Sequence, residues 1–189
     1  NFISITFKSI KLQNMQFNFL VTMLLAALIP LVIGSLWYNP KTFGNAWMHA
    51  CGFDEKKLQE NFNAPLVFGL SYFMSIFIAF GLSSIVIHQF GFFGMLQRVI
   101  AENNVDALAF LKTGFDHYGN EFRTFKHGAL HGTITGIAIA LPMVTINALF
   151  ERRGFKYIAI NAGYWILSLC IMGGFICQFA KIGADFFSK

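Results

Sequence analysis

Charged side chains are scarce in this sequence of 189 residues: 12% of the residues are charged, whereas 56% are hydrophobic. Soluble domains carry about 25% charged residues. The chain therefore has too few charges to cover a water-facing surface, which excludes an ordinary soluble globular protein. The 24 phenylalanines favour instead a protein with a broad lipid boundary.

Formal charges are missing altogether from four long apolar stretches, which cover residues 17–38, 64–88, 127–150 and 157–180. A bilayer core of about 30 Å is crossed by about 20 helical residues, and a helix satisfies its own backbone hydrogen bonds. Short alternating segments, which are typical of membrane barrels, are absent from the sequence. We predict an all-α polytopic membrane protein, a single domain over residues 1–189 with four transmembrane helices. We expect short interfacial helices in the first and second connections.

The segment before the first apolar stretch has two interpretations. Residues 1–14 are either an upstream extension before a natural start at Met15 or an interfacial segment whose apolar side chains flank Lys8 and Lys11. The sequence leaves both open. At the other end of that stretch Trp37 and Tyr38, followed by Trp47, are predicted as interfacial anchors.

The net charge of +5 comes from basic residues spread through the loops. They form no continuous stripe, so we interpret them as topology signals and contacts to anionic lipids rather than a nucleic-acid surface. The predicted partners are the lipid bilayer and either further copies of the chain or other membrane-protein subunits. Arg152, Arg153 and Lys156 crowd one tight turn, and we assign loops 39–63 and 151–156 to the cytoplasmic side on that basis.

Small residues recur every four positions in two of the stretches. Gly128, Gly132 and Gly136 form one such ridge, and the second stretch carries Ser71, Ser75 and Ser83. Ridges of this kind let helices approach closely, so we predict helix packing. The ridges either face each other or serve a subunit interface, and a pathway lined by small residues is the functional alternative.

Two histidines, His127 and His131, share one helical face because they lie four residues apart. This spacing suits a metal ion, but Gly128 stands where a zinc-protease helix has Glu, and the cysteines form no CxxC pair. We predict no metal and no cofactor, and assign the pair to hydrogen bonding between helices or to titration at the interface. A metal- or haem-binding protein that uses the pair is the weaker alternative. The other histidines, His49, His88 and His117, are interpreted as interfacial or loop residues.

Polar residues flank the tight turn between the third and fourth stretches. We expect Asn147, with Glu151 one turn later, to reach Asn161 or Tyr164 and so clamp the hairpin. The alternative is a polar pathway, to which His131 and Thr135 would also contribute. Pro30 and Pro142 are expected to kink their helices.

Catalytic signatures are missing: the sequence has no nucleophile elbow, P-loop or Gly-rich dinucleotide fingerprint. No charge lies in the predicted membrane core, which disfavours an ion pump. We therefore predict a non-enzymatic membrane protein that acts as an oligomer or as a subunit of a larger complex. The alternative is a small oligomeric transporter or channel with a polar pathway near His131, Asn147 and Asn161.

Three stretches of sequence together resemble one family. They are Trp37-Tyr38-Asn39-Pro40 with Phe43-Gly44 and Trp47-Met48, then His131-Gly132 through Pro142 to Asn147 and Arg153, and Asn161-Ala162-Gly163-Tyr164-Trp165. They resemble the bacterial four-helix membrane protein family catalogued as domain of unknown function 1761. The resemblance implies a four-helix membrane fold in the bacterial inner membrane and no established activity. The connection over residues 89–126 looks longer here than in many members.

Overall fold

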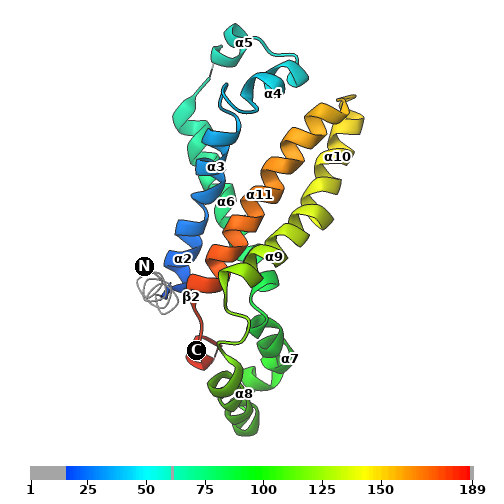
Figure 1. Ribbon diagram of the computed structural model, residues 1–189. Coiled ribbons are helices and arrows are strands. Elements are labelled where there is room, and N and C mark those ends of the chain that lie inside the picture. Colours follow the sequence, from blue (N-terminus) through cyan, green and yellow to red (C-terminus); the bar gives the residue numbers. More distant parts are fainter. Residues whose placement is uncertain (1–15, 61, 188–189) are drawn as a thin grey trace, which may run out of the picture.

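The computed structural model describes residues 16–60 and 62–187, and nearly all of its regular structure is helical. The prediction for residues 1–14 lies outside this range. Figure 1 shows an elongated bundle with α4 and α5 at one end and α7 and α8 at the other. The predicted all-α fold is confirmed.

Four helical segments are long and apolar enough to cross a membrane: Phe19–Trp37, Ala64–Val86, Phe125–Phe150 and Phe155–Phe179. Their ends lie within two residues of the predicted boundaries. The second is one helix, α6 (Ala64–Val86), and so is the fourth, α11 (Phe155–Phe179). The first and third are interrupted.

The interruptions occur at the two prolines. In the first segment α2 (Phe19–Ala26) ends three residues before α3 (Ile29–Trp37), whose second residue is Pro30. In the third, α9 (Phe125–Thr135) passes through the π-helical turn η1 (Gly136–Ala140) into α10 (Leu141–Phe150), whose second residue is Pro142. Proline donates no hydrogen bond and clashes with the preceding turn, so the backbone rearranges just before it.

The first two connections contain the predicted short helices. The first holds α4 (Gly44–Cys51) and α5 (Glu55–Gln59), and Asp54 caps α5 by accepting a hydrogen bond from the Lys57 N–H. The second holds α7 (Gln89–Ala101) and α8 (Val105–Tyr118). Helix α6 ends at Val86, and the chain turns at Ile87 and His88 before α7 begins, so α7 is a separate helix.

The two ends of the described chain lie together. Strand β1 (Phe17–Asn18) pairs in parallel with β2 (Ala180–Lys181), and α12 (Ala184–Phe187) follows. An even number of spans places both ends on the same side, next to α7 and α8 (Figure 1). This pairing fixes the end of α11 against the start of α2.

Helix α11 is the centre of the bundle: half of its most apolar 18-residue window is buried, against 11% for the third span. Its partner along the glycine ridge is α9. A Cβ atom at Gly128 or Gly132 would collide with backbone atoms of Gly173 or Leu169, and one at Gly136 would lie 2.7 Å from the Ile166 Cα. The glycines of α9 and η1 therefore pack on α11 rather than on the serines of α6.

The serine positions of α6 divide between the core and the surface. Ser75 and Ser83 are buried, whereas Ser71 is exposed. Around them a core cluster joins α2, α6 and α11, with Met23, Leu82 and Met172 among its members. The serine positions thus pack chiefly toward the core that α2 and α11 share with α6.

Candidate metal centre

Three histidines meet at the end of the bundle that carries α7 and α8. His127 and His131 lie one turn apart on α9, and His88 lies between α6 and α7. Their nearest ring nitrogens all lie within 4.8 Å of one another. His127 and His131 are half-buried and His88 is exposed, so the cluster lies at the surface of the bundle.

The position of His88 follows from the way α6 ends. Val86 and Ile87 are both buried, and Ile87 adopts an extended backbone that breaks the helix. His88 then returns to helical geometry as the first residue before α7. Two buried aliphatic side chains therefore fix the turn that carries the exposed imidazole.

The three rings are already packed against one another. The Nε2 atoms of His88 and His127 lie 2.8 Å apart, a hydrogen bond in which one ring carries the proton. The ring centroids of His131 lie 5.0 Å from His88 and 4.5 Å from His127. Two imidazole nitrogens on a tetrahedral metal ion are separated by about 3.3 Å. A small widening of this pair would therefore accommodate an ion.

The Phe122 ring lies against the cluster, and its backbone has an unusual conformation. Its φ of 61° lies in the left-handed region, where a bulky side chain is strained. Its ring lies 5.1 Å from the His127 ring and 5.8 Å from the His88 ring, centroid to centroid, yet its side chain remains exposed. The strained residue thus holds an aromatic ring against two of the three imidazoles.

Arg123 anchors the segment that leads into α9. The guanidinium is buried, and its Nε donates a hydrogen bond of 2.7 Å to the Cys177 carbonyl. It also donates to the Ala180 carbonyl at the end of α11. Burial lowers the pKa of this group below its ordinary value. The last carbonyls of a helix favour a cation, so Arg123 both caps α11 and positions the histidine cluster.

Of the three histidines the sequence predicted the joint face of His127 and His131, but it assigned His88 to an interface or loop. The prediction of no metal counted two imidazoles. His88 lies 39 residues away along the chain, and no spacing rule connects it to the pair. The structure brings a third imidazole to the pair. Three nitrogen ligands can hold a four-coordinate ion and leave one position for another ligand.

The other predicted polar residues lie elsewhere, and the expected bridge from Asn147 to α11 does not form. Asn161 accepts a hydrogen bond of 3.0 Å from the Tyr38 hydroxyl, and Tyr164 donates one of 3.0 Å to the Pro30 carbonyl. The hairpin helix α11 is therefore bonded to α3, not to α10. Asn147 is exposed.

Glu151 and Thr135 make local contacts. Glu151 lies 3.7 Å from the Arg153 Nε within the turn, and the Thr135 hydroxyl donates to the His131 carbonyl at 2.8 Å. Thr135 and Asn147 line one groove beside α6, whereas Tyr164 lines another beside α3. Three of the predicted pathway residues are therefore divided between two grooves.

The predicted anchors form an aromatic cluster at the opposite end. The Trp37 Nε1 donates to the Ile160 carbonyl at 3.0 Å, and the Tyr38 ring packs against Trp47 with centroids 5.3 Å apart. These contacts pin the end of α3 to α11 and to α4. The sequence indicated the residue types but not their partners.

Comparison with known proteins identifies a family and no activity. No curated protein and no solved structure matches the chain. Residues 21–177, most of the chain, match the family described as "Protein of unknown function (DUF1761)". The motifs around Trp37, His131 and Asn161 lie inside this range. The chain therefore belongs to this family of unknown function.

Proposed function

We propose that this membrane protein binds a divalent transition metal ion through His88, His127 and His131. The observation that supports the proposal is the approach of three imidazole nitrogens to within 4.8 Å of one another, from two separate segments. Imidazole suits Zn²⁺, Cu²⁺ and Ni²⁺, and a site made only of neutral nitrogen ligands keeps the full charge of the ion. The remaining coordination position is available to water or to a second ligand.

Direct metal binding by the full chain in lipid nanodiscs tests the proposal. Samples stripped with a chelator are dialysed against Zn²⁺, and metal per chain is measured by elemental analysis. We expect one ion per chain. Substituting His88→Ala, His127→Ala or His131→Ala should each weaken binding by at least about tenfold, since even partners that merely orient a metal ligand are worth that much.

Two histidines outside the cluster provide matched controls. His49 lies in α4 at the opposite end, and the His117 ring is bonded to the Thr113 carbonyl within α8. His49→Ala and His117→Ala should bind Zn²⁺ as the original chain does. Absence of stoichiometric metal would overturn the proposal, and so would equal binding by the cluster variants and these controls.

A second proposal concerns association. Only 11% of the best window of the third span is buried, and the exposed Asn147 on that span has no side-chain hydrogen bond among the described residues. A polar side chain that faces lipid is unfavourable, which supports a partner at this face, either another copy or another subunit. Asn147→Leu should then lower the oligomer fraction measured by cross-linking in native-lipid nanodiscs. A strictly monomeric original chain would contradict this proposal, as would an Asn147→Leu variant that cross-links as the original chain does.

A location in the bacterial inner membrane is proposed from the family resemblance alone.

A further inference from the structure

A cavity of about 300 Å³ lies directly beside the histidine cluster, between the first turn of α7 and the last turns of α8. His88 forms part of its wall and belongs to both sites. Four aromatic side chains line much of it: Phe92, Phe115, Tyr118 and Phe122. Such a size and an aromatic lining are typical of sites for small organic molecules.

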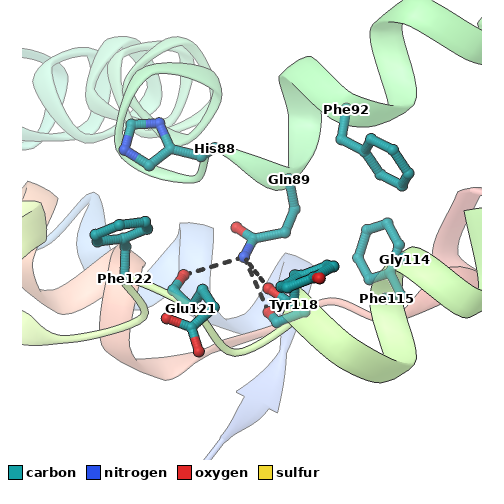
Figure 2. A pocket seen from close by; sticks show the side chains of 9 residues that line it. His88, Gln89, Phe92, Gly114, Phe115, Tyr118, Glu121 and Phe122 are labelled. Carbon is teal, nitrogen blue, oxygen red and sulfur yellow. Dashed lines mark hydrogen bonds between the residues drawn. The ribbon is translucent and has the colours of Figure 1, made fainter.

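One buried polar atom in this wall is left without a partner. The Gln89 Nε2 donates to the carbonyl oxygens of Tyr118, Gly119 and Glu121 at 3.2, 3.0 and 3.1 Å (dashed lines in Figure 2). Three acceptors on that side fix the orientation of the amide, because its oxygen cannot donate to them.

The Gln89 Oε1 consequently points away from the α8 carbonyls. Figure 2 shows it directed to the side of His88 and Phe122. The side chain is 8% exposed, and the oxygen has no hydrogen-bond partner among the described residues. Buried acceptors are nearly always satisfied, so this one indicates a donor supplied from outside the chain.

The charges around the cavity restrict what that donor belongs to. Glu121 is the one formally charged residue among those that line it, and the neighbouring Arg123 is turned toward the end of α11. Without a bound metal ion, an anion would meet the Glu121 carboxylate with no cation among the lining residues to compensate it. With the divalent ion proposed at His88 in place, a cation would be repelled. A neutral molecule avoids repulsion in both states.

We propose that this cavity binds a neutral, ring-bearing molecule with one O–H or N–H donor, of the phenol class. The donor bonds the Gln89 Oε1, and the ring packs between the aromatic walls with its edge beside His88. The choice of a neutral ligand over a cation rests on the proposed metal site. The need for a donor and a ring does not.

A matched pair of probes isolates the hydrogen bond without changing the protein. 4-Ethylphenol is neutral at pH 7, since a phenol titrates near pH ~10. Its methyl ether, 4-ethylanisole, has the same ring and no donor. Binding is measured by saturation-transfer NMR on the full chain in metal-free nanodiscs, with empty nanodiscs to subtract partition into lipid. We expect the phenol to bind at least about fivefold more tightly than the ether.

A second set of binding measurements uses a variant in which the shape of the cavity is changed. A Cβ atom at Gly114 would lie 2.6 Å from the Phe92 ring, so Gly114→Ala forces that ring to move. Gly94 lies on the same helix as Phe92 and has nothing within 4 Å of such an atom. We expect Gly114→Ala to weaken phenol binding by at least about fivefold and Gly94→Ala to leave it unchanged.

Equal affinity for phenol and ether, no binding above empty nanodiscs, or an unchanged Gly114→Ala variant would each overturn the inference. Metal retention is measured on a second portion of each preparation after dialysis against Zn²⁺. Phenol binding without metal retention would overturn the metal proposal alone, and metal retention without phenol binding would overturn the cavity proposal alone.

Discussion

The two ends of the bundle use polar side chains in opposite ways. At the aromatic end, formed by α4 and the adjoining turns of α3 and α11, the polar tips of Trp37, Tyr38 and Tyr164 each donate to an identified acceptor. At the histidine end, formed by α7, α8 and the start of α9, three imidazoles lie close together and the Gln89 Oε1 has no hydrogen-bond partner among the described residues. Polar groups with hydrogen-bond partners inside the chain stabilise the fold, whereas polar groups without such partners are available to a ligand. The hydrogen-bonded aromatic tips are consistent with a structural role at one end, and the histidines and Gln89 support the binding role proposed for the other.

The largest expected effect on stability lies at Arg123, a buried charged side chain at the histidine end. Arg123→Ala leaves the Cys177 and Ala180 carbonyls without their donor, and we expect a loss of about 2–5 kcal/mol in the free energy of unfolding. Reversible unfolding in mixed micelles measures it. Arg98→Ala serves as the control, because its side chain is 90% exposed in a surface ion pair with Glu102, and it should change stability by less than about 1 kcal/mol.

The second-largest effect on stability is expected at the contact between α11 and α9, the helix that carries two of the histidines. Gly132→Ala places a methyl group against the Leu169 backbone and should cost about 1–3 kcal/mol, because α9 must move away from α11. Gly69→Ala in α6 meets nothing within 4 Å and should gain up to about 1 kcal/mol from helix propensity. If both variants unfolded alike, the glycine ridge would not be the tight contact between these helices.

A smaller effect is expected at the aromatic end. Tyr38→Phe removes the hydrogen bond to Asn161 and should cost about 1 kcal/mol of stability. Metal affinity should stay unchanged, because the histidines lie at the opposite end. Tyr118→Phe, in a side chain that is 67% exposed, is the control for stability. Loss of metal binding in Tyr38→Phe would mean that the two ends are not independent.

The sequence predicts these regions unequally. Hydropathy located the four spans because lipid exposure and helical hydrogen bonding act within each segment. The spacing of His127 and His131 was equally local. His88 was beyond such reasoning, because its place depends on where α6 ends against the core and how α7 leaves it.

The polar clamp failed for the same reason. Asn161 and Tyr164 were expected to bond across the nearest hairpin, yet their partners Tyr38 and Pro30 come from the first span, 123 and 134 residues away. Residue type indicated that these side chains need partners in a membrane. The packing of α3 against α11 determines which partners they bond to. The residue pattern within either segment does not predict that packing.

The smallest effect on stability is expected at Phe122, where metal binding should nevertheless change. Phe122→Gly relieves a left-handed backbone strain of about 1–2 kcal/mol and loses ring contacts of similar size, so stability should shift by less than about 1 kcal/mol. Zn²⁺ affinity should nevertheless fall by about tenfold, because the ring no longer holds His88 and His127 in place. Arg152→Gly is the matched control: its φ of 57° is also left-handed, so it should gain about 1 kcal/mol without altering metal affinity. An unchanged metal affinity in Phe122→Gly would show that the strained phenylalanine does not position the imidazoles. A fall in Zn²⁺ affinity at unchanged stability would show that binding and folding can be changed separately at the histidine end. At the aromatic end, where the polar groups are already hydrogen-bonded, a substitution should instead change stability.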